Sequence, residues 1–143
     1  VVLIMWVSHH QMLGMLERVN YRILFANGLL LLTVTFVPFP TAVLAEHLAT
    51  PEAKTAVAFY CATFVVNGLV WNLLSEAITR SGLVRSEIKQ ETLAEGRKTN
   101  LLGLGVYVMA ALLAFVQPWL GLALNVSLWA VWIRLAYRSR RSA

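Results

Sequence analysis

The stretch ILFANGLLLLTVTFVPFPTAVL, residues 23–44, decides the fold class of this chain. It carries no charge, and its only polar side chains are Asn27 and a few threonines. An apolar run of about 20 residues is what an α-helix needs to cross the hydrocarbon core of a bilayer. Pro38 and Pro40 stand near its far end, where each lacks the N–H that a helix interior requires. The stretch therefore predicts a transmembrane helix that is broken or kinked by its prolines. Thr41 directly follows the second of them.

The rest of the composition agrees with a membrane protein. Of 143 residues, 59% are hydrophobic and only 13% are charged, and the mean hydropathy is +0.68. A soluble domain carries about 25% charged residues. We expect an all-α fold, a polytopic membrane helical bundle that forms one transmembrane domain over residues 1–143. The predicted helices are residues 1–16, 23–44, 53–78, 101–116 and 119–137, joined in part by a cytoplasmic loop at residues 79–100.

The loop at residues 79–100 has a mixed charge pattern. Its spacing permits a short surface helix, whose extent we expect Gly82 and Gly96 to limit because glycine weakens a helix.

The basic residues give an orientation. All of them except Lys54 fall in the first connection, in the third connection or near the C-terminus. Alternate connections of a helical bundle lie on the same side of the membrane, and the side rich in Lys and Arg is the cytoplasmic one. We therefore expect a cytoplasmic C-terminus. Because the chain opens with Val1 inside an apolar segment, we also expect a longer protein with one further helix upstream, which gives six helices in a full subunit.

Two adjacent histidines, His9 and His10, follow Trp6 in the first segment. Neighbouring residues on a helix point about 100° apart, since there are 3.6 residues per turn. This separation disfavours joint binding of one metal ion. The remaining histidine, His47, lies in a predicted exterior loop, which disfavours haem. A polar side chain at membrane depth needs a partner in the protein or water. The pair is thus expected to pin helices together or to make a pH-sensitive contact.

Catalytic and nucleic-acid functions lack support in the residues. The chain has no Asp, so all seven acids are Glu, and Cys61 has no second cysteine to pair with. No nucleophile and base are placed for joint catalysis, so we expect neither an enzyme nor a cofactor or metal. The positive charge is better explained by topology than by nucleic acid. Within the predicted helices, interhelical hydrogen bonds are the expected role of four asparagines: Asn27, Asn67, Asn72 and Asn125.

Trp6, His9, His10 and Asn27, followed by F-V-P-F-P-T at residues 36–41, together resemble the transmembrane protein 175 potassium-channel family, in particular its short bacterial members. The resemblance is strongest over residues 6–46. It implies a six-helix subunit that lies in a bacterial plasma membrane and has both termini in the cytoplasm. It also implies a homotetramer surrounded by membrane lipid that conducts K⁺.

The same resemblance implies the site. In this family the first helix lines the ion path, and its large apolar side chains form the constriction. That helix carries an Arg…Phe-Ser-Asp motif absent from this sequence, so the pore-lining residues are not assigned. By resemblance, Trp6, His9 or His10, and Asn27 belong to a polar network that holds the pore helix. The prolines and Thr41 shape the outer end of the kinked helix.

Two other functions stay open at this point. A secondary transporter needs a broken helix at mid-membrane, for which Pro38 and Pro40 are the only candidates. A non-conducting membrane assembly subunit would pass no ions and would tolerate changes at His9 and Asn27.

Overall fold

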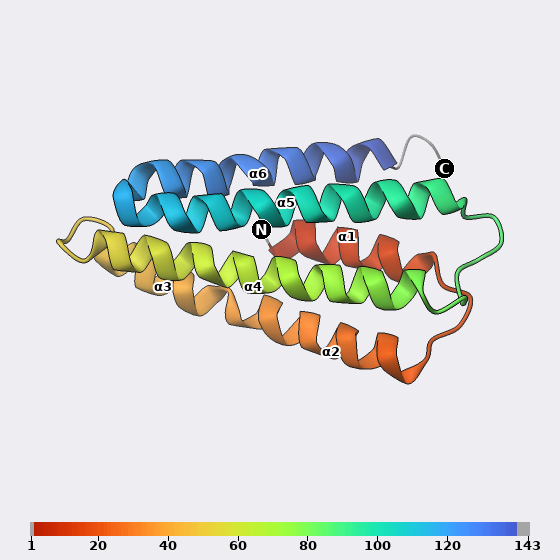
Figure 1. Cartoon of the computed structure of the whole chain (residues 1–143). Coiled ribbons are helices and arrows are strands. Elements are labelled where there is room, and N and C mark those ends of the chain that lie inside the picture. The colour runs from red at the N-terminus through yellow and green to blue at the C-terminus, as the bar shows by residue number, and fades with distance from the viewer. Residues whose placement is uncertain (1, 140–143) are drawn as a thin grey trace.

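The computed structural model describes residues 2–139, and this part of the chain is an elongated bundle of α-helices (Figure 1). Within the described residues there is no strand, only one isolated bridge between two loops. The predicted all-α fold is therefore confirmed. The helices are α1 Val2–Gly14, α2 Tyr21–Phe36, α3 Pro38–His47, α4 Ala53–Thr79, α5 Gln90–Val116 and α6 Pro118–Ser139.

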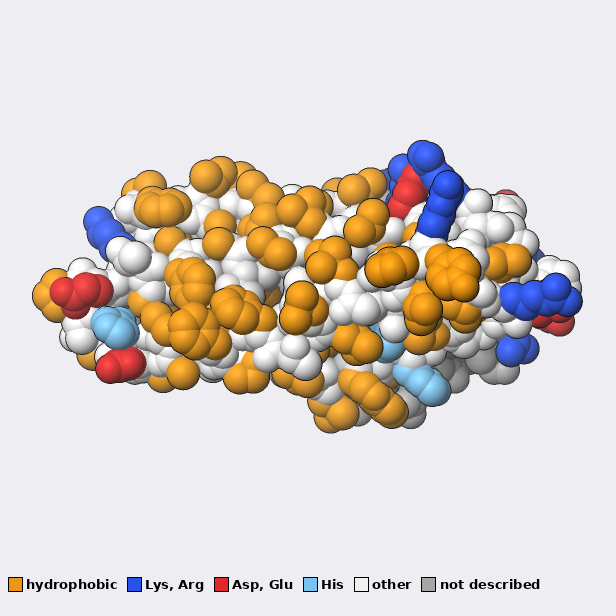
Figure 2. Space-filling view, turned by 90° about the horizontal axis from the view of Figure 1, so that it is seen from below, with side chains coloured by type: hydrophobic (Ala, Val, Ile, Leu, Met, Phe, Trp, Pro, Cys, Tyr) orange, Lys and Arg blue, Asp and Glu red, His pale blue; other side chains and the backbone are white. Residues whose placement is uncertain are grey.

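Four stretches of the described chain are long and apolar enough to cross a membrane. Figure 2 shows hydrophobic side chains over the length of the visible face, with charged side chains toward its two ends. The predicted first span is described only as α1, whose 13 residues are fewer than the roughly 20 that a full crossing needs. The four long stretches are Tyr21–His47, Ala53–Thr79, Gln90–Val116 and Pro118–Leu135.

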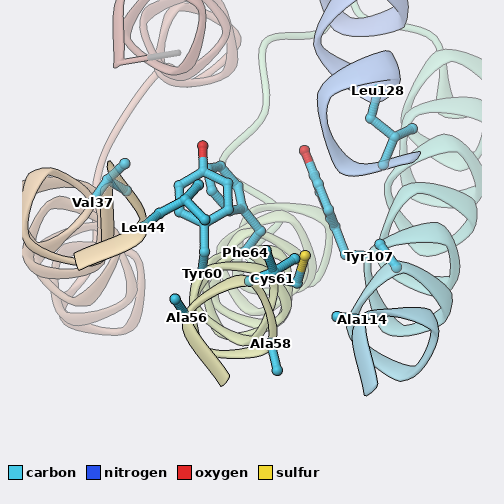
Figure 3. Close-up of a cluster of buried hydrophobic side chains, with 12 residues drawn as sticks. Val37, Leu44, Ala56, Ala58, Tyr60, Cys61, Phe64, Tyr107, Ala114 and Leu128 are labelled. Carbon is cyan, nitrogen blue, oxygen red and sulfur yellow. The ribbon is translucent and has the colours of Figure 1, made fainter. Parts of the chain in front are cut away.

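Helix α4 is the centre of the bundle, because it packs against α2, α3, α5 and α6. Its Phe64 is almost fully buried and stacks on Tyr107 of α5, with ring centroids 5.6 Å apart. The ring centroid of Tyr60, one turn earlier, lies 5.0 Å from that of Phe64. Figure 3 shows this aromatic group between Leu44 of α3 and Leu128 of α6. The core is thus built around one face of α4.

The connection between α1 and α2 pairs with the connection between α4 and α5. Leu16 and Val84 form an antiparallel bridge, the N–H of Glu17 donates to the carbonyl of Leu83 at 2.9 Å, and the N–H of Arg85 donates to that of Met15 at 2.9 Å. The two connections that the charge pattern assigned to one side of the membrane therefore lie at the same end of the bundle. The terminal Arg140 and Arg141, which entered the same argument, lie outside the described residues.

Helix α5 begins at Gln90, whereas the sequence predicted a loop up to residue 100. Gly96 does not end the helix, because one glycine in a helix costs only about 1 kcal/mol relative to alanine. Glu91 in the first turn is favourably placed at the positive end of the helix dipole. Gly82, in contrast, has φ of +66° and makes the turn after α4. Both glycines were expected to limit a surface helix. Gly82 lies between α4 and α5, whereas Gly96 lies within α5.

The predicted helix over residues 23–44 is two helices, α2 and α3, with Val37 between them. Val37 keeps helical dihedral angles, φ −52° and ψ −38°, so the chain is kinked rather than unwound. Pro38 takes the first position of α3, where a missing N–H costs least. The kink lets α2 and α3 lie along successive parts of α4 (Figure 1).

Candidate functional site: polar contacts and a groove between helices

His9 of α1 and Asn27 of α2 are hydrogen-bonded to each other, the ring Nε2 donating to the amide Oδ1. Both side chains are half-buried. The bond joins two helices whose backbones are otherwise connected by a short loop, Met15 to Asn20. Asn20 stabilises the start of α2, because its Oδ1 accepts from the N–H of Ile23 at 3.0 Å. The structure thus brings together two of the four residues predicted for the polar network.

The other two, Trp6 and His10, pair with each other. Their rings stack with centroids 5.5 Å apart and planes 13° from parallel. Trp6 is 59% exposed and His10 is exposed as well. The adjacent histidines therefore act on different faces of α1, as the helical geometry requires. His9 holds α2, and the Trp6–His10 pair faces outward from this chain.

Pro38 and Pro40 cannot donate to the carbonyls of Val34 and Phe36, and the N–H of Val37 donates to the carbonyl of Val34 instead, at 3.2 Å. The hydroxyl of Thr41 donates to the carbonyl of Val37 at 2.8 Å, and the Thr41 N–H donates to the same carbonyl at 3.2 Å. Pro40 is buried against the bundle, while Pro38 is exposed. Such local repair is what allows proline within a membrane helix.

Two further asparagines bind across helices. The amide of Asn67 in α4 donates to the hydroxyl of Thr33 in α2 at 3.0 Å. The amide of Asn72, also in α4, donates to the carbonyls of Gly68 at 2.8 Å and of Asn100 in α5 at 3.4 Å. These contacts confirm the interhelical role expected for Asn27, Asn67 and Asn72.

Asn125 differs from the other three. It is 0% exposed, and neither its Nδ2 nor its Oδ1 has a hydrogen-bond partner among the described residues. An unpaired buried polar group costs about 1–3 kcal/mol. Asn125→Leu, which keeps the side-chain shape, is therefore expected to raise the free energy of unfolding by about 1–2 kcal/mol, measured by thermal unfolding in detergent.

The matched control for this prediction is Asn67→Leu, which leaves the Thr33 hydroxyl without its donor. We expect this variant to lose stability. A loss of stability in Asn125→Leu as large as that in Asn67→Leu would contradict the unpaired state of Asn125.

A groove of about 680 Å³ opens between α1, α4, α5 and α6. Its wall is mixed, since amide and hydroxyl groups alternate with large aromatic rings. In this wall, the indole N–H of Trp132 donates to the hydroxyl of Tyr107 at 3.1 Å. The lining residues that carry this character include Ser8, Gln11, Asn67, Asn72, Trp129 and Trp132. Polar groups at this depth are expected to face protein or water rather than lipid.

Some features of the site carried no pattern that sequence reasoning could use. The Trp132–Tyr107 bond and the contact of Trp132 with Gly103 depend on how α5 and α6 pack, and a Cβ at Gly103 would meet the Trp132 ring. The guanidinium of Arg85 donates to the carbonyl of Leu16 at 3.3 Å across two loops. Among the described residues, no three His, Cys, Asp or Glu side chains gather as metal ligands would.

Comparison with known proteins matches the first part of the chain to a family model. Residues 1–38 match the model of the endosomal/lysosomal potassium channel TMEM175. This range contains Trp6, His9, His10 and Asn27. A potassium channel of Chamaesiphon minutus is 38% identical over 120 residues, which are 83% of this chain and 59% of that protein. A potassium channel of Streptomyces collinus is 37% identical over 125 residues, 86% of this chain and 61% of that protein.

A solved structure matches most of the bundle. It is the crystal structure of a lysosomal potassium-selective channel TMEM175 homologue from Chamaesiphon minutus, with a TM-score of 0.84 and 32% sequence identity over 94% of this chain and 67% of that one. The chain thus spans about three fifths of the curated relatives and two thirds of the solved one. Sequence and architecture agree, and the chain belongs to the TMEM175 potassium-channel family.

Proposed function

We propose that this chain is part of a potassium-selective channel subunit. The observation that carries the proposal is the match in architecture to a potassium-selective channel, at a TM-score of 0.84 and 32% identity. Two curated relatives named as potassium channels, one of them also from Chamaesiphon minutus, are 37–38% identical to this chain. No cofactor takes part, and the ligand is the permeating K⁺ ion.

In this proposal the described helices form a shell that supports a pore-lining helix with an apolar constriction. His9 and Asn27 would fix α1 to α2, and α2 is fixed in turn to α4 by the Thr33–Asn67 bond. The exposed Trp6–His10 pair would then face the pore helix or a neighbouring subunit. Four copies around a central axis would make a homotetramer in a bacterial plasma membrane, with the basic end and the C-terminus in the cytoplasm.

The secondary-transporter alternative finds less support in the kink. Ion sites of such transporters use unwound helices with free carbonyl groups. Val37 instead keeps helical dihedral angles, and its carbonyl accepts two hydrogen bonds from Thr41. A non-conducting assembly subunit is distinguished from a channel by flux alone.

Flux through liposomes tests the proposal. Full-length protein reconstituted into K⁺-loaded liposomes should release K⁺ down its gradient when a protonophore lets protons enter to balance the charge, at a rate proportional to the amount of protein. Empty liposomes and liposomes that contain heat-denatured protein serve as controls. No release above these controls supports the assembly subunit, and release that proceeds without the protonophore, in a fixed ratio to a second ion, supports the transporter. Either result overturns the channel.

A further inference from the structure

A second groove, about 440 Å³ in volume, lies at the basic end of the bundle, on the outer side of α5. Its wall joins Thr79, at the end of α4, to one face of the first turns of α5. Two basic side chains, Arg97 and Lys98, line it together with apolar ones. The apolar lining residues on α5 are Leu93, Ala94, Leu101 and Leu102.

The charge balance at this groove is positive. The carboxylate of Glu76 is shared by two guanidinium groups, those of Arg80 at 2.5 Å and of Arg97 at 3.3 Å. One acid therefore faces two bases, and no salt bridge within the described residues involves Lys98. Of the two acids on α5, Glu95 lines the larger groove instead, and Glu91 stands two turns before Lys98 and is not among the residues that line this groove. The rim thus keeps a surplus of positive charge.

The position of the groove along α5 matches the boundary between hydrocarbon and headgroups. Leu101 and Leu102 are 50% and 63% exposed and begin the uninterrupted apolar part of α5. Lys98 precedes them by about one turn, and a turn rises about 5.4 Å. The basic groups therefore stand where lipid phosphates lie, and the leucines stand where acyl chains begin. Among residues 2–139, the opposite end of the bundle has Lys54 as its one Lys or Arg.

We propose that this groove binds a phospholipid with an anionic headgroup, whose phosphate contacts Arg97 and Lys98 and whose acyl chain lies over Leu101 and Leu102. Basic pockets between membrane helices are suited to such headgroups. The arginine can donate two parallel hydrogen bonds to phosphate oxygens, and the lysine adds a point charge. The site does not depend on ion conduction, so it stands or falls separately from the proposed channel function.

Native mass spectrometry of the full-length protein tests this site. The protein is incubated in detergent with equal amounts of phosphatidylglycerol and phosphatidylcholine, which differ in headgroup charge. We expect the wild type to retain phosphatidylglycerol about tenfold more than phosphatidylcholine. The double variant Arg97→Gln, Lys98→Gln should retain the two lipids about equally, because the two positive charges that favour an anionic headgroup over a zwitterionic one are lost.

A matched control removes two charges from the same end of the bundle without touching the groove. Arg18→Gln, Arg22→Gln does this, since both arginines lie between α1 and the first turn of α2 and are exposed. This control should keep the wild-type preference. Equal loss in the two double variants would mean that the preference reflects the overall charge of this end, and would overturn the site. Release of the lipid by excess inorganic phosphate would overturn it too, because a site for phosphate alone does not need the acyl chain.

Discussion

Gly121→Ala is expected to destabilise the bundle by about 3 kcal/mol, the upper end of the cost of overpacking. A Cβ at Gly121 would lie 2.7 Å from the carbonyl oxygen of Ala110 and 2.9 Å from the backbone nitrogen of Ala114. These are backbone atoms of α5, which cannot rotate away as a flexible side chain can. Helix α6 would have to move off α5, and close approach through small residues is a main source of helix association in membranes.

Thermal unfolding in detergent measures this effect, and Gly105→Ala is its matched control on the facing helix. Nothing lies within 4 Å of a Cβ at Gly105. The free energy of unfolding of this control should equal that of the wild type or exceed it by up to about 1 kcal/mol, because alanine is the better helix former. A Gly121→Ala protein as stable as the control would show that α5 and α6 are not in the described contact.

Loss of the His9–Asn27 bond is expected to have the largest effect on transport among single polar changes. In the proposed channel this bond fixes α1 to α2, so His9→Ala and Asn27→Ala should each lower K⁺ flux about fivefold. This factor corresponds to about 1 kcal/mol, the size of an interhelical hydrogen bond in a membrane. The K⁺ flux of the double variant should be no lower than that of either single variant, because both changes remove the same contact.

Thr35→Ala is the control for this cycle. Thr35 is exposed, and its hydroxyl donates to the carbonyl of Leu32 within α2, so its removal breaks no bond between helices of the described chain. K⁺ flux through liposomes is measured together with thermal unfolding. The two measurements separate a loss of flux caused by the missing contact between α1 and α2 from one caused by unfolded protein. Additive losses in the double variant, or an equal loss in Thr35→Ala with unchanged stability, would contradict the role assigned to His9.

The sequence predicts much of this fold because membrane helices depend on local composition. The apolar run at residues 23–44 and the prolines within it predict a kinked helix, and the structure has the kink at Val37. Length and hydropathy predict the membrane span, and the missing N–H of proline predicts the kink. Helix α5 extends back to Gln90 for a different reason, since its first turns are polar and leave no hydropathy pattern to detect.

The candidate site divides in the same way. Polar residues within apolar segments are conspicuous, so Asn27, Asn67 and His9 are found without a structure, and a partner across helices can be expected for each. Which partner each one has depends on packing. Neither the separate roles of His9 and His10 nor the unpaired state of Asn125 follows from local sequence. The pairing of the two loops through Leu16 and Val84 joins residues far apart in the chain and has no local pattern.

The central claim is that the chain belongs to a subunit that passes K⁺ selectively. The most direct test is the reversal potential of the current through full-length protein in a planar bilayer, with KCl on one side and NaCl on the other. A potassium-selective channel predicts a reversal potential far from zero, on the side set by the K⁺ gradient, and one that follows the K⁺ concentration when it is changed. A reversal potential near zero, or no current from protein that is verified to be inserted, would contradict the account.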